Sequence, residues 1–246
     1  MKLPILIGLA LAAAPLLAAD ANPKDEIKAA AKKLAEAANY SWKSTPQSSG
    51  SGQGGGRFRA GPTEGKTEKD GFTWLSMSRG ESTTEAAIKG GKAAVKTEEG
   101  WKTTQELSEG SQEGDRRNRG RFLGRMLENY KAPVQQAEDL LAKAKELKKA
   151  DDGYSGDLTE EGVKELLTFG GRRRDGSEAP APTNAKGSVK FWVKDGVLAK
   201  YEFKVQGTAN FGGNDVDIDR TTVVEVKDVG STKVEVPAEA KAKLGA

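Results

Sequence analysis

Three aspartates alternate along one short stretch of the chain, and their spacing is compatible with binding a cation. Asp215, Asp217 and Asp219 lie on one face if the stretch is extended, and carboxylate oxygens are the ligands that Ca²⁺ prefers. The stretch lacks the glycine and the distal glutamate of an EF-hand loop. Two interpretations stay open: a solvated strand face or turn, and a weak calcium site.

Two runs of arginine could bind anions. The first run leads into a predicted helix and the second has three consecutive members. They are Arg116, Arg117, Arg119, Arg121 and Arg125, and then Arg172, Arg173 and Arg174. A guanidinium pairs with phosphate bidentately, so the runs could contact anionic lipid headgroups or a partner in the cell envelope. A solvated loop and helix start is the alternative. No aromatic residues are interleaved to stack on bases, so we expect no nucleic acid partner.

The residue types that are missing exclude most catalytic chemistry. The 246 residues contain no histidine and no cysteine, which rules out an imidazole base, a thiolate nucleophile, cysteine or histidine metal ligands, and disulfides. Carboxylates, lysine, tyrosine and hydroxyl groups remain, but nothing marks a general acid among the 36 acidic residues. We therefore expect neither an enzyme nor a cofactor.

The N-terminus has the pattern of a secretory signal peptide. A lysine at position 2 precedes an apolar run over residues 3–17, and small residues follow it. We expect cleavage after Ala19 or Ala21, so that residues 1–21 are the signal peptide and residues 22–246 form a single domain. No cysteine follows the signal, so no lipid anchor is expected, and the predicted location is the periplasm or the extracellular space.

Hydrophobic periodicity predicts an α+β domain. Apolar residues at helical spacing predict helices over residues 22–38, 122–130, 134–147 and 158–169, so that residues 115–170 form a helical insert. Alternation and turn signals predict antiparallel strands near residues 40–44, 57–59, 72–77, 82–88, 93–95, 189–193, 197–205, 218–229 and 234–236. Residues 48–56 are rich in glycine and serine and predict a loop, and a short helix is expected after Pro237.

The C-terminal passage resembles a known family. It contains Gly187-Ser-Val-Lys-Phe-Trp-Val-Lys-Asp-Gly-Val-Leu, then a long strand, then Asp228-Val229-Gly230, and then Val234-Glu235-Val236-Pro237. These strand and turn patterns are similar to those of the lipoprotein-localisation carriers, the LolA-like superfamily, and their lipid-transfer relatives. The rest of the chain matches only in the order of its elements.

The resemblance implies a fold and a function. It implies a strongly curved antiparallel sheet, an incomplete barrel, with helices over its concave face and an apolar ligand between them. It further implies a non-catalytic carrier, a monomer, that binds lipid or lipoprotein acyl chains and touches a membrane surface transiently. The apolar residues expected to line the cavity are Trp74, Leu123, Met126, Leu127, Phe191, Val193, Tyr201, Phe203, Val205, Val224 and Val226. The alternative is a ligand-free structural or interaction module in which these residues form an ordinary packed core.

Overall fold

A computed structural model of the chain describes residues 22–49, 61–109, 114–168, 180–211 and 214–245. The predicted signal peptide, most of the loop at residues 48–56, the predicted strand at 57–59 and the second arginine run lie outside these ranges. The side chains of residues 114–119 and 211 lie outside the description as well.

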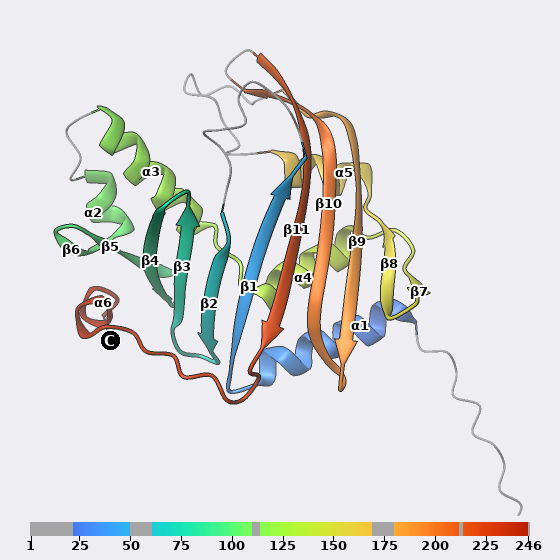
Figure 1. The fold of residues 1–246 in the computed structure, drawn as a ribbon, viewed down its shortest axis with the longest axis horizontal. Coiled ribbons are helices and arrows are strands. Elements are labelled where there is room, and N and C mark those ends of the chain that lie inside the picture. The colour runs from blue at the N-terminus through green and yellow to red at the C-terminus, as the bar shows by residue number, and fades with distance from the viewer. Residues whose placement is uncertain (1–21, 50–60, 110–113, 169–179, 212–213, 246) are drawn as a thin grey trace, which may run out of the picture.

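The described residues form one antiparallel sheet of eleven strands. The strand order is β6-β5-β4-β3-β2-β1-β11-β10-β9-β8-β7. The strands are β1 (Asn39–Ser48), β2 (Thr63–Glu68), β3 (Thr73–Arg79), β4 (Ser82–Lys89), β5 (Lys92–Thr97), β6 (Gly100–Thr103), β7 (Lys148–Ala150), β8 (Gly153–Asp157), β9 (Thr183–Lys194), β10 (Val197–Phe211) and β11 (Asn214–Lys227). Within the described residues the edge strands β6 and β7 do not pair, so the sheet is open, and its long strands bend visibly in Figure 1.

Helices lie on both faces of the sheet, but unequally. They are α1 (Pro23–Glu36), α2 (Thr104–Glu109), α3 (Gly114–Glu128), α4 (Pro133–Lys143), α5 (Glu160–Leu167) and α6 (Ala238–Lys243). Three of them, α1, α4 and α5, cover one face of the strands from β1 to β9, as Figure 1 shows. We call this the concave face. α2 and α3 pack together beside β5 and β6, and α6 packs on the opposite face of those strands.

The main core lies between the concave face and its helices. α1 contributes one apolar stripe, in which Ile27 and Leu34 are completely buried. α4 and α5 contribute Leu140 and Val163 to the same cluster. The N-terminus of α1 is tied to the C-terminal end of α4, because Lys24 Nζ donates to the carbonyl oxygen of Ala144 at 2.6 Å. The helices therefore form a connected layer over the sheet.

A second, smaller core lies on the other face of β4, β5 and β6. Strand alternation sends Ala86 and Val95 into the main core but Ala87 and Ala94 into this one. α6 covers these alanines and Trp101. Both faces of this half of the sheet are therefore buried.

The predicted α+β class, with helices over one face of an antiparallel sheet that does not close, is confirmed. Two local predictions need correction. Residues 234–236 do not join the sheet; they run extended towards α6, and their alternation reflects the burial of Val236 under that helix. The second central helix ends at Lys143 and is followed by the hairpin β7–β8, which the sequence did not indicate. Trp101 and Leu107, which hydrophobic periodicity assigns to no element, belong to β6 and α2.

Candidate functional site

The apolar surface of the concave face is built by strand register. Phe191 on β9 pairs with Tyr201 on β10, and Tyr201 pairs with Val224 on β11. Val226 pairs in turn with Trp42 on β1. Paired residues share a face of the sheet, so these side chains form a continuous apolar surface across four strands.

The helices α1 and α4 fill the space above one end of this surface. Phe191 and Tyr201 are completely buried, and their ring centroids lie 6.3 Å apart. Leu34 of α1 and Leu140 of α4 are equally inaccessible and belong to the same cluster. The interior is thus packed like an ordinary protein core at this end.

The other end of the concave face is covered less completely. Met77 on β3 and Ile218 on β11 are only half-buried, and so are Leu123 of α3 and Leu166 of α5. All four contact the edge of the main core. Half-buried apolar residues therefore border the main core at this end, beside Val205 and Leu167, which are completely buried.

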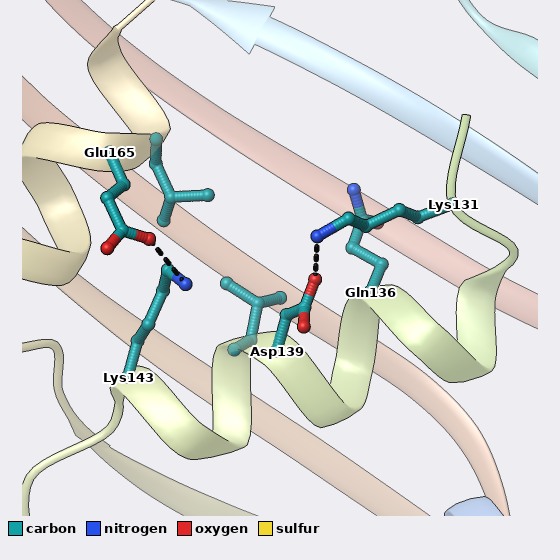
Figure 2. Close-up of a pocket in the computed structure, with 7 residues that line it drawn as sticks. Lys131, Gln136, Asp139, Lys143 and Glu165 are labelled. Atoms are coloured by element: carbon teal, nitrogen blue, oxygen red, sulfur yellow. Dashed lines mark hydrogen bonds and ion pairs between the residues drawn. The ribbon is translucent and has the colours of Figure 1, made fainter. Parts of the chain in front are cut away.

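A pocket of about 240 Å³ lies between α4 and α5 (Figure 2). Its lining residues are Lys131, Gln136, Asp139, Leu140, Lys143, Glu165 and Leu166. Two ion pairs stand on its walls: Lys131 with Asp139, and Lys143 with Glu165, the latter at 2.7 Å. Gln136 and the two leucines make up the rest of the lining, so only the leucines are apolar.

Two hydrogen bonds join this pocket to the sheet. The Tyr201 hydroxyl donates to Gln136 Oε1 at 2.6 Å. Arg220 on β11 donates from Nη2 to the carbonyl oxygen of Leu166 at 3.4 Å, and burial lowers the pKa of its guanidinium. The helix layer above the concave face is therefore held by apolar packing and by a few polar contacts near the pocket.

Three tyrosines face the interior in one cluster. Burial is the main cause that raises the pKa of Tyr40, to about 12, and the hydroxyl of Thr67 partly opposes it. Burial, and then the neighbouring tyrosines, raise the pKa of Tyr130 and of Tyr201 well above the ordinary value. Tyr130 stacks on Trp42 with ring centroids 6.2 Å apart. Its buried hydroxyl makes no hydrogen bond within the described structure.

Most of the predicted cavity residues lie together. The buried members of the main core are Leu127, Phe191, Tyr201, Phe203, Val205, Val224 and Val226, with Leu123 and Val193 half-buried at its edge. Two lie elsewhere. Trp74 packs against the second core, because Leu75 takes the inward position on β3. Met126 is 40% exposed, because Leu123 and Leu127 form the inward stripe of α3.

The alternating aspartates point to the neighbouring strand. Asp215, Asp217 and Asp219 on β11 accept hydrogen bonds from Asn210, Thr208 and Gln206 on β10, at 2.8 to 2.9 Å. No group of three acidic side chains within the described residues is placed to hold a metal ion. The described geometry makes the run a cross-strand polar ladder.

The first arginine run lies in α3. Arg121 and Arg125 are exposed there, and Arg116, Arg117 and Arg119 lie in its first half. Over the described ranges, no helix is both long enough and apolar enough to cross a membrane.

Sequence reasoning missed the polar residues of the interior. Gln136 and Tyr130 carried no signal beyond their helical periodicity. Arg220 could have been found, because it alternates with Ile218, Thr222 and Val224 and so falls on the apolar face of its strand.

The sequence matches no protein-family model and no curated protein. Several solved structures are similar. The Mycobacterium tuberculosis lipoprotein LppX has a TM-score of 0.47 and 12% identity, over 89% of this chain and 100% of its own. LprF from Mycobacterium bovis has a TM-score of 0.43 and 8% identity, over 89% and 97%.

A LolA superfamily protein from Nitrosomonas europaea has a TM-score of 0.33 and 11% identity, over 87% of this chain and 95% of its own. The superfamily suggested by the C-terminal passage is thus represented among the similar structures. At these scores the similarity says nothing about what the chain binds.

Proposed function

We propose that the chain is a non-catalytic carrier that acts outside the cytoplasm and binds an apolar ligand between the concave face of its sheet and its helices. The ligand class is the acyl chain of a lipid or a lipoprotein. The observation that carries the proposal is the pocket between α4 and α5, because one of its leucines, Leu140, belongs to the main core and the other, Leu166, packs against that core.

The energetics favour such a ligand. Each methylene group removed from water contributes about 0.8 kcal/mol, so a long acyl chain could supply roughly 10 kcal/mol before the costs of association. No catalytic residue is needed for this. The predicted signal peptide would bring the protein to the compartment in which lipids and lipoproteins are moved.

The pocket must widen to accept a long chain. Its volume of about 240 Å³ is below the roughly 300–1,000 Å³ of preformed ligand sites. A single ion pair, Lys143–Glu165, joins α4 to α5 there; it is partly exposed to solvent, and such pairs contribute little to stability. We therefore propose that these two helices separate to admit the ligand.

A ligand-free structural or interaction module is the second candidate. It is favoured by one specific observation, the complete burial of Phe191 and Tyr201 beneath α1 and α4. A core that is already filled at this end needs no ligand. The two candidates differ in whether a lipid stays bound to the purified protein.

Native mass spectrometry of mature protein, recovered gently from a bacterial cell envelope, separates the two candidates. The carrier predicts a stoichiometric lipid adduct that organic extraction removes. In the variant Leu166→Lys, a charge at the edge of the pocket should remove the adduct, whereas Val229→Lys, at a surface valine that is 41% exposed, should keep it. A mass without adduct, unchanged after incubation with lipid vesicles, would contradict the carrier and favour the second candidate.

A further inference from the structure

α3 has a second apolar stripe that faces solvent. Leu127 is 4% exposed and packs into the main core, with Leu123 beside it. Phe122 is 58% exposed and Met126 is 40% exposed. They are two of only three large apolar side chains in the described residues that are this accessible. An exposed aromatic residue one helical turn from an exposed methionine marks a surface that a partner could cover.

Two arginines lie on the same outward surface. At 3.6 residues per turn, Arg121, Arg125, Phe122 and Met126 fall within an arc of about 140°, on the side of the helix away from Leu123 and Leu127. We call these four residues the outer face of α3. Neither arginine side chain forms an ion pair or a hydrogen bond with another described residue.

The net charge of α3 is strongly positive. Residues 114–128 contain five arginines but only two acids, Asp115 and Glu128. In Figure 1 the helix lies at the β4–β5 end of the sheet, next to α2. The outer face of α3 therefore combines exposed apolar side chains with positive charges that no described acidic side chain pairs.

We infer that the outer face of α3 docks on an anionic lipid surface. Phe122 and Met126 would enter the interface between headgroups and acyl chains, as amphipathic helices do, while Arg121 and Arg125 pair with lipid phosphates. Charge complementarity selects this partner, because the exposed arginines are interleaved with apolar side chains and pair with no acid in the described part of the chain. Docking does not depend on the pocket between α4 and α5, so it is separable from the proposed carrier function.

Vesicle cosedimentation tests the inference directly. The protein should bind vesicles of phosphatidylcholine mixed with phosphatidylglycerol much more tightly than vesicles of phosphatidylcholine alone, and added salt should weaken the binding. Arg121→Gln with Arg125→Gln should reduce the partition coefficient about 30-fold, at about 1 kcal/mol for each arginine. Phe122→Ser with Met126→Ser should also reduce it.

Matched variants control for charge, exposure and folding. Lys28→Gln with Lys32→Gln removes two exposed cations at the same helical spacing on α1, and Val229→Ser removes an exposed apolar side chain; neither should change binding. Leu166→Lys should lose the lipid adduct but keep vesicle binding, which separates docking from the carrier function. Circular dichroism confirms that each variant is folded.

Three results would overturn the inference. Equal binding of the unmodified protein to neutral and anionic vesicles would remove the role of the arginines, and this comparison needs no variant. Binding unaffected by the α3 substitutions would place the contact elsewhere. A dimer that dissociates in Phe122→Ser with Met126→Ser would make the outer face of α3 a contact between two copies of the chain.

Discussion

At the scale of single residues, the interior combines apolar packing with a small number of buried hydroxyl groups. Tyr201 satisfies its hydroxyl by donating to Gln136, whereas the hydroxyl of Tyr130 is buried without a hydrogen bond in the described structure. A buried polar group without a partner costs about 1–3 kcal/mol. The stacked pair of Tyr130 and Trp42 therefore packs well through its rings but carries an energetic cost at one oxygen.

The variant Tyr130→Phe should raise the free energy of unfolding by about 1 kcal/mol, because it removes that oxygen and keeps the ring. Urea denaturation followed by circular dichroism measures the change. Tyr201→Phe is the matched control and should lower the free energy of unfolding by about 1 kcal/mol, because Gln136 loses its donor. The prediction for Tyr130 is wrong if both variants are destabilised equally.

At the scale of elements, the proposed entry of the ligand requires α4 and α5, two helices over the concave face, to separate from each other. α4 and α5 are joined by the pair Lys143–Glu165 and by apolar contacts around Leu140. An ideal Cβ at Gly162 of α5 would lie 2.7 Å from the Cβ of Lys143. This close approach offers a way to lock the two helices together.

Gly162→Cys with Lys143→Cys should form a disulfide, since disulfide Cβ atoms lie about 3.8 Å apart and α5 need move by only about 1 Å. The chain has no cysteine, so the disulfide is the only one possible. We expect the oxidised protein to take up no lipid from vesicles and the reduced protein to take it up normally. Uptake by the oxidised protein, with Gly162→Cys alone as the control, would show that the ligand does not pass between α4 and α5.

The elements that could be predicted are those with one buried face. β10 alternates Tyr201, Phe203 and Val205 with charged residues, and its sequence alone indicates a strand. β3 is different, because both of its faces are partly covered: Leu75 packs into one core and Trp74 at the edge of the other. When both faces of a strand are apolar, the alternation of its residues cannot show which face points towards the ligand. The hairpin β7–β8 was missed because its residues are mostly polar or glycine, and its pairing depends on the sheet edge of β9.

The candidate site was predictable only in part, because periodicity shows which face of an element is buried but not which element that face meets. The buried strand residues followed from alternation, but the pocket depends on the approach of α4 to α5, which are separated by a hairpin. Helical periodicity identifies the inward stripe of each helix but not the neighbour that it meets. Met126 illustrates this, since α3 has apolar residues on two sides and only the packing shows that Leu127 is the inward one.

At the scale of the whole molecule, Tyr40 and Tyr201 are buried in the main core and Tyr130 packs half-buried against it, so stability should fall in alkaline solution. The pKa of Tyr40 is raised from 10.0 to about 12, and the pKa values of Tyr130 and Tyr201 are raised as well. The tyrosines of the unfolded state lose their protons at lower pH than those of the folded state. The contribution of the protonated tyrosines to the free energy of unfolding is therefore complete below pH 10 and is lost as the pH rises through 12.

A titration followed by phenolate absorbance and by circular dichroism checks this prediction. We expect most of the phenolate signal to appear together with unfolding, and the protein in concentrated urea to titrate near the ordinary pKa of tyrosine. Ionisation of all four tyrosines before any loss of structure would contradict the buried cluster.

The proposed apolar ligand lies between the concave face and the helices. The tryptophans offer a direct test of this position. Trp42 faces the main core, whereas Trp192 lies half-buried on the other face of the sheet, with its indole donating to Asp152 at 2.8 Å. One variant would keep only Trp42 and another only Trp192, with phenylalanine at the other three of the four positions. Circular dichroism would verify that both are folded.

The decisive measurement is the fluorescence of these two variants with a lipid that carries bromine on its acyl chain, since bromine quenches tryptophan only at short range. The proposed ligand site predicts that the brominated lipid quenches Trp42 strongly and leaves Trp192 unchanged, while the same lipid without bromine quenches neither. Unquenched fluorescence from Trp42 with bound lipid, or quenching of Trp192 alone, would contradict it.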